Sequence, residues 1–217
     1  MKYKILALDH DDTVVDSTRT IHFPSLIETL NVLRPDYRLS MEEYVEYCFE
    51  PGFYSFCYDI LHFSEEEMNY QVDHWYSVVK SRIPKVFDGM KRIITKFKEN
   101  GGKICVVSYS HKDYILRDYA ANGLPLPDAV YGFEQPPEKR KPNVWPLVDM
   151  MGVFNVEPSE IIMVDDMKQG LEMAKKAGVD FVGAGWANDV KSVEEVMRSL
   201  SDYYCKTTEE LESILFS

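Results

Sequence analysis

Three short apolar runs constrain the fold of this 217-residue chain more than any other feature. None of them alternates between apolar and polar residues, and each ends directly before polar side chains that can do chemistry. The runs are Ile5-Leu6-Ala7-Leu8 before Asp9, Ile104-Cys105-Val106-Val107 before Ser108, and Ile161-Ile162-Met163-Val164 before Asp165-Asp166. Strands that are buried on both faces of a parallel sheet have this character. The runs therefore predict central strands of a parallel sheet.

Helical patterns alternate with strand patterns from residue 86 onward. Weaker strand patterns lie at 180–184 and 129–131. The expected helices run from Asp88 to Asn100, from about Lys112 to Asn122, from about Lys168 to Gly178, and onward from the capping box at Thr207. This alternation predicts an α/β fold with a doubly wound, Rossmann-like parallel sheet.

Residues 16–85 interrupt the alternation. Capping boxes begin at Ser40 and Ser64, and no buried-strand run lies in this region. We therefore expect a core formed by residues 1–15 and 86–217, with an all-helical subdomain inserted at 16–85. Its aromatic residues either line a substrate pocket or pack a small helical core, and packing is the favoured interpretation; they are Phe53, Tyr54, Phe56 and Tyr58.

Composition excludes several classes of partner. The chain has 24 Lys+Arg against 36 Asp+Glu, a formal charge of −12, which argues against binding nucleic acid or an anionic membrane. No apolar run approaches the roughly 20 residues that cross a bilayer, and Asp9 comes too early for a secretion signal. We expect a cytoplasmic protein with reduced cysteines, because Cys48, Cys57, Cys105 and Cys205 lack the spacing of a metal site.

The residues after the three strands indicate the chemistry. Ligands of open parallel sheets bind beyond the carboxyl ends of the strands, so Asp9, Ser108 and Asp165-Asp166 should converge. A carboxylate there can attack phosphorus and form an aspartyl-phosphate, and a divalent cation offsets the repulsion between the two anions. Oxygen ligands from Asp9, Asp11 and Asp166 suit Mg²⁺, while Ser108 and a lysine would bind the phosphoryl oxygens.

Four motifs together resemble those of the haloacid dehalogenase-like superfamily of phosphohydrolases. Residues 9–17 (DHDDTVVDS) are similar to its D-x-D-x-T-x-x-D-S motif, and Val106-Val107-Ser108 to its strand-end Ser/Thr motif. Lys141-Pro142 is similar to the lysine motif, and residues 164–170 (VDDMKQG) to the acidic motif in its E/D-D-x-x-x-G form. The order and spacing agree over most of the chain.

This resemblance implies a role for each matched residue. Asp9 would be the nucleophile, and Asp11 the general acid and base, with its backbone carbonyl on the metal. Asp9 and Asp166 would bind Mg²⁺, with Asp165 in direct or indirect contact with it, while Ser108 and Lys141 would bind phosphate. The helical subdomain at 16–85 would match the family's cap, which closes over the site and contacts the substrate. Strand alternation turns His10 away from these carboxylates, so we assign it no chemistry.

Departures from the family pattern are also informative. Asp12 replaces the glycine that is most common after the second aspartate, which strains the turn if that residue needs a positive φ. Met167 stands where a serine is frequent. Dehalogenases typically have an aromatic residue at the position of Asp11, so the aspartate favours phosphate esters over haloacids.

Three other functions share some features with this sequence. A sugar-phosphate mutase of the β-phosphoglucomutase type shares the acidic motif. The candidates for the cap residues that would bind its substrate are chosen only by their charge, and they are Arg19, His22, Lys80 and Arg82. A phosphoacceptor signalling domain would place the acidic pair after the first strand instead of late in the chain. Dinucleotide binding at Gly183-Ala184-Gly185 lacks the third glycine, because Asn188 takes its place.

The sequence thus predicts a Mg²⁺-dependent phosphomonoester hydrolase that acts on a small phosphorylated metabolite through an aspartyl-phosphate. Phosphoglycolate, sugar phosphates and nucleoside monophosphates all stay open as substrates, and so does the oligomeric state.

Overall fold

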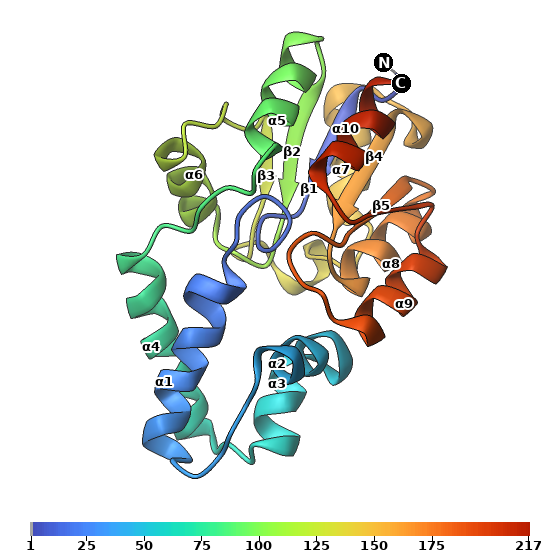
Figure 1. The fold of residues 1–217 in the computed structure, drawn as a ribbon. Coiled ribbons are helices and arrows are strands. Elements are labelled where there is room, and N and C mark those ends of the chain that lie inside the picture. Colours follow the sequence, from blue (N-terminus) through green and yellow to red (C-terminus); the bar gives the residue numbers. More distant parts are fainter. Residues whose placement is uncertain (1) are drawn as a thin grey trace.

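A six-stranded sheet forms the centre of the computed structural model, which describes residues 2–217 (Figure 1). Its strands are β1 (Ile5–Leu8), β2 (Lys103–Val107), β3 (Ala129–Tyr131), β4 (Ile161–Asp165), β5 (Asp180–Ala184) and β6 (Tyr203–Cys205). They lie in the order β3-β2-β1-β4-β5-β6, and every pairing is parallel. The chain winds outward from β1 first to one side and then to the other, so the strand order reverses between β1 and β4.

Helices cover both faces of the sheet. They are α5 (Met90–Glu99), α6 (Lys112–Ala121), α7 (Trp145–Phe154), α8 (Lys168–Ala177), α9 (Lys191–Leu200) and α10 (Thr208–Phe216). Leu6 and Leu8 of β1 share one buried cluster with α5, α6 and α10. Ile5 and Ala7 share another with α7, α8 and α9, because successive side chains of a strand point to opposite faces. The predicted doubly wound, Rossmann-like fold is confirmed.

Residues 16–85 form a separate group of helices, called here the helical unit, which lies at the bottom of Figure 1. It contains α1 (Phe23–Leu33), α2 (Met41–Tyr47), α3 (Phe53–Ser55) and α4 (Glu65–Ser81), with π-helical turns at Thr18–His22, Cys48–Gly52 and Phe56–Ile60. Capping boxes start α2 at Ser40 and α4 at Ser64. Its buried cluster includes Leu26, Leu30, Phe56 and Met68, so Phe56 packs as expected, whereas Tyr58 is 41% exposed.

The chain enters and leaves the helical unit at one point beside β1. The amide of Asp16 donates to the carbonyl of Lys85 (2.9 Å), and the amide of Phe87 donates to that of Val14 (3.0 Å). Val15 and Val86 form an antiparallel bridge between these bonds. The unit is therefore attached directly beyond the carboxyl end of the central strand.

Some elements differ from the sequence-based expectations. Helix α5 begins at Met90 after a Gly89 cap with φ of 86°, and not at Asp88. The reason is tertiary: a Cβ at Gly89 would lie 2.3 Å from Oγ1 of Thr208, which donates to the Asp88 carbonyl. Helices α7 and α9 and the edge strand β6 were not predicted. In the described part of the chain, no helix has both the length and the apolarity to cross a membrane.

Candidate active site

The side chains predicted to converge meet at the carboxyl edge of the sheet. A cavity of about 750 Å³ lies between this edge and the helical unit. Five of the six predicted site residues line it, namely Asp9, Asp11, Ser108, Lys141 and Asp166. Asp165 is fully buried beside them. Phe53 and Tyr54 of the helical unit also line the cavity, so these two aromatic residues have the pocket role that was the less favoured interpretation.

Lys141 forms the electrostatic centre of the site. Its Nζ lies 2.9 Å from Oδ1 of Asp9 and 2.7 Å from Oδ2 of Asp165, and the residue is only 4% exposed. Burial alone would lower the pKa of Lys141, but the charges of Asp165 and Asp9 raise it above its ordinary value. The ammonium therefore stays charged between two strand-end carboxylates. The neighbouring Lys139 has different surroundings, because its Nζ lies over the Trp145 ring.

Asp165 holds Lys141 in place. Its Oδ2 accepts from Lys141, and its Oδ1 accepts from the amide of Met167 (2.8 Å). A Cβ at Gly170 would lie 2.2 Å from that Oδ2. The glycine of the acidic motif is thus required because helix α8 passes directly over the Asp165 carboxylate.

Gly170→Ala should therefore disturb both stability and activity. The added methyl group overlaps Asp165, and overpacking of this kind costs about 1–3 kcal/mol. Displacing Asp165 also displaces Lys141, so turnover should fall together with the urea midpoint. Gly152→Ala is the matched control, because Gly152 lies in helix α7 with open space around it. Equal stability and activity of the two variants would contradict this account.

Three carboxylates are placed to hold a metal ion. Asp9, Asp165 and Asp166 each offer an oxygen, and these oxygens lie within 4.8 Å of one another. Burial raises the pKa of Asp166, and the charges of Asp165, Asp12 and Asp9 raise it further. Such a set of hard oxygen donors suits Mg²⁺, which would relieve the repulsion. The donor chemistry at this edge therefore fits a divalent cation.

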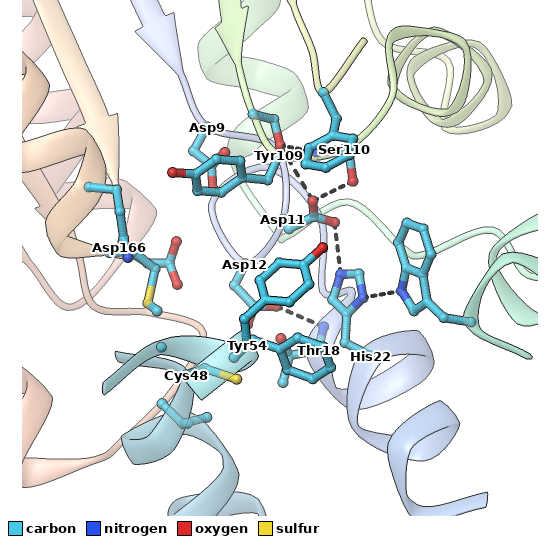
Figure 2. A pocket seen from close by; sticks show the side chains of 18 of the residues that line it. Asp9, Asp11, Asp12, Thr18, His22, Cys48, Tyr54, Tyr109, Ser110 and Asp166 are labelled. Carbon is cyan, nitrogen blue, oxygen red and sulfur yellow. Dashed lines mark hydrogen bonds and ion pairs between the residues drawn. The ribbon is translucent and has the colours of Figure 1, made fainter. Parts of the chain in front are cut away.

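The Asp11 carboxylate is held by three donors (Figure 2). Ser110 Oγ donates to its Oδ2 over 2.6 Å, and Ser108 Oγ to the same oxygen over a longer 3.4 Å. Nε2 of His22 lies 3.2 Å from Oδ1. Burial alone would raise the pKa of Asp11, but the hydrogen bonds that it accepts from His22 and Ser110 lower it. Asp11 is therefore an ionised carboxylate in this arrangement.

His22 links Asp11 to the helical unit. The indole Nε1 of Trp75, on α4, donates to Nδ1 of His22 over 2.9 Å. Because an indole N–H is only a donor, Nδ1 must accept, and the proton lies on Nε2, which donates to Asp11. Sequence reasoning named His22 only as a possible cation and missed Ser110 and Trp75. A second serine two positions after Ser108 was the available signal for Ser110.

Asp12 has the left-handed conformation suspected from its place in the motif, with φ of 56°. Its Oδ1 accepts from the amide of Thr18 over 2.9 Å, and its Oδ2 accepts from Asn188 over 3.3 Å. Aspartate tolerates this region because its short side chain bonds locally. Asp12 thus ties the start of the helical unit to the loop after β5.

His10 lies outside the cavity. It is buried, and its Nε2 lies 3.2 Å from Oδ2 of Asp118 on α6. Its side chain thus faces a helix beneath the sheet edge and contributes to packing.

The chain is an α/β protein with carboxylates gathered at the carboxyl edge of its parallel sheet. The chain belongs to the haloacid dehalogenase-like hydrolase family, whose model matches residues 6–184. The assignment to haloacid dehalogenase-like phosphatases that was made from four motifs is confirmed.

Known relatives match along the whole chain. A curated relative from Caldanaerobacter subterraneus subsp. tengcongensis, named "Putative pyrophosphatase PpaX", is 25% identical over 224 residues, covering 99% of this chain and 96% of its own. A structure named "predicted phosphoglycolate phosphatase", from Haemophilus somnus, has a TM-score of 0.76 at 18% identity over 99% of each chain. CbbY from Rhodobacter sphaeroides, solved with phosphate, has a TM-score of 0.70 at 17% identity over 96% of each chain. At these identities the two structures establish the shared fold.

Proposed function

We propose that this protein is a Mg²⁺-dependent phosphomonoester hydrolase that acts through a phosphorylated Asp9. The observation that carries the proposal is the Lys141 ammonium 2.9 Å from Asp9, beside Asp166, whose carboxylate can share a cation with that of Asp9. An ammonium here can bind a phosphoryl oxygen while Asp9 faces the phosphorus. The family membership supports a divalent metal in general, and the oxygen donors support Mg²⁺ in particular.

The metal would be held by the carboxylates of Asp9 and Asp166 and by the backbone carbonyl of Asp11. Asp165 already has a donor on each oxygen, so we assign it an indirect role. When bound, the cation lowers the repulsion between the nucleophile and the ester and withdraws charge from the phosphoryl group.

The protein side chains would carry two displacement steps. In the first, an Asp9 oxygen bonds to phosphorus, the bond to the ester oxygen breaks, and Asp11 gives a proton to the leaving alcohol. In the second, Asp11 removes a proton from water, the water oxygen bonds to phosphorus, and the bond to Asp9 breaks, which regenerates the carboxylate. A protonated Asp11 would be the form required for the first step, and an ionised Asp11, held by His22 and Ser110, the form required for the second. Ser108 and Lys141 would bind the phosphoryl oxygens.

We further propose that the helical unit (16–85) acts as a cap over a core of residues 1–15 and 86–217. It contributes Phe53, Tyr54 and one face of α4 to the cavity wall, and through Trp75 and His22 it touches the acid/base residue. We expect it to exclude water from the cavity during the first step.

The mutase alternative has less support. Of the four basic residues suggested for it, only His22 lines the cavity among the described residues, and it is engaged with Asp11. Arg19 donates to the Ala187 carbonyl, and Arg82 pairs with Glu28. We therefore propose that the substrate is a small phosphate ester and that the protein hydrolyses it.

Metal removal tests the proposal directly. With p-nitrophenyl phosphate as substrate, phosphate release should fall at least about 100-fold after chelation and return when Mg²⁺ is added. Mg²⁺ should also raise the melting temperature of the wild type, because a ligand that binds only the folded state stabilises it. Asp166→Asn should weaken both responses. Full activity in excess chelator would refute the metal assignment.

A further inference from the structure

The two sides of the cavity wall differ in charge. The core side carries the carboxylates, Ser108 and Lys141. The side formed by the helical unit is largely aromatic and apolar, with Tyr44, Phe53, Tyr54, Met68, Trp75 and Tyr76. Within residues 2–217, this side contributes no Lys, Arg, Asp or Glu to the wall. The part of a substrate that extends away from the phosphate therefore meets aromatic rings.

The volume indicates a leaving group larger than two or three carbons. The cavity holds about 750 Å³, within the range of about 300–1,000 Å³ that is typical of pockets for drug-sized ligands. A phosphate with a compact anionic tail would leave much of the aromatic wall without a partner. A planar ring would cover it, because aromatic rings gain from stacked and edge-on contacts.

The cations of the wall lie on its core side. Arg140 and Lys141 are the only Arg or Lys among the described lining residues, and both belong to the core. Lys141 faces Asp9 and Asp165, while the Arg140 guanidinium lies 3.9 Å from the Phe133 ring centroid and its Nε donates to the Gln135 carbonyl. Of the wall's histidines, His111 bonds to Tyr76 and His22 to Asp11. A second phosphate or a carboxylate would therefore be buried on the cap side without a counter-charge, which is costly.

One polar group on the aromatic side has no partner. Gln71 is 2% exposed, lines the cavity, and shares the inward face of α4 with Met68, Val72 and Trp75. Its Oε1 has no hydrogen-bond donor among the described residues. A buried acceptor without a donor is costly, so a donor supplied by a ligand would be recognised strongly.

We propose, on the basis of the function proposed above, that the substrate is a phosphomonoester of an alcohol that carries a planar aromatic ring with an N–H or O–H donor. The ring lies against the aromatic side of the cavity, and its donor bonds to Oε1 of Gln71. Gln71 is then a specificity-determining residue, and the protein rejects pyrophosphate, bisphosphates and phosphorylated acids.

A panel of matched esters tests this inference. The probes are benzyl phosphate, 3- and 4-aminobenzyl phosphate, cyclohexylmethyl phosphate, 2-phosphoglycolate and inorganic pyrophosphate. We expect kcat/KM to be highest for an aminobenzyl ester, about tenfold lower for benzyl phosphate, and lowest for the two anionic probes. Gln71→Leu should remove the preference for the amino group, and Gln135→Leu, outside the cavity, should keep that preference.

Two readouts separate this inference from the proposed function. Binding of each ester to Asp9→Asn protein, measured by calorimetry, reports recognition without turnover. A preference for 2-phosphoglycolate, pyrophosphate or the cyclohexyl ester, with turnover that depends on Asp9, would overturn the inference and leave the hydrolase intact. Absence of Asp9-dependent turnover on every probe would overturn the proposed function, and the binding order would then decide the inference by itself. If Gln71→Leu kept the preference for the amino group, Gln71 would not be a specificity-determining residue.

Discussion

Asp9→Asn will reduce phosphate release by on the order of 10⁴-fold or more while preserving the fold. An amide nitrogen and oxygen replace two carboxylate oxygens of nearly the same shape, so the end of β1 keeps its packing. The variant lacks the nucleophile, and its residual rate should be no higher than binding and charge stabilisation alone provide. Single-turnover phosphate release at saturating Mg²⁺ measures the loss.

The phosphorylated intermediate gives an independent check on this prediction. Acid quenching of the wild-type reaction, followed by peptide mass spectrometry, should find phosphate on the peptide that contains Asp9. The same experiment with Asp9→Asn should find none. Asp113→Asn, an exposed carboxylate at the start of α6, is the control and should behave as wild type. Phosphate on another residue, or activity retained by Asp9→Asn, would refute the proposed mechanism.

Lys141→Met is expected to have the largest effect on stability. The change removes the cation between Asp9 and Asp165 and leaves two buried carboxylates facing each other, a situation that typically costs about 3–5 kcal/mol. Turnover should fall by about 10²–10³-fold as well, because a charged phosphate ligand is lost.

The pH dependence of this loss has a defined sign. Burial and the charge of Asp9 already raise the pKa of Asp165 to about 7, and without Lys141 it rises further above its unfolded value. Groups of that kind cost stability as the pH rises through the unfolded pKa, so the defect should grow from pH 4 to pH 7. Mg²⁺ should recover part of it, because a cation can take over the role of the ammonium.

Urea unfolding at several pH values, with and without Mg²⁺, measures the defect. Lys139→Met is the matched control, because Lys139 stands two residues earlier and lies over Trp145 instead of carboxylates. Lys141→Arg should retain most of the stability. If Lys141→Met proved as stable as Lys139→Met at pH 7, the buried ion-pair account would be wrong.

The sequence was informative where local patterns determine structure. Unbroken apolar runs predicted β1, β2 and β4, since a strand covered on both faces needs no polar alternation. The capping boxes at Ser40, Ser64 and Thr207 predicted helix starts because they are satisfied within one turn. The convergence of Asp9, Ser108 and Asp166 followed from a topological rule that holds for any parallel sheet.

Sequence reasoning missed contacts that depend on how distant elements pack. Trp75 meets His22 only because α4 lies against the start of α1, and no spacing in the chain signals that bond. Gln71 looks like an ordinary helical residue until its neighbours on α4 are seen to face the cavity. The Asp88 carbonyl, just before helix α5, accepts from Thr208, 120 residues away, and no local pattern signals that contact.

The central position of β1 has a consequence for biosynthesis. The strand that ends at Asp9 is translated first, but its sheet partners are β2 at residues 103–107 and β4 at residues 161–165. Each pairing joins strands that are far apart in the sequence. Such pairings form late in folding, because closing the long loop between the strands costs chain entropy. The helical unit also depends on residues translated late, because Val190 belongs to its buried cluster and Val193 packs against it. A nascent chain therefore cannot complete either the sheet around β1 or this cluster until residues 161–193 have left the exit tunnel.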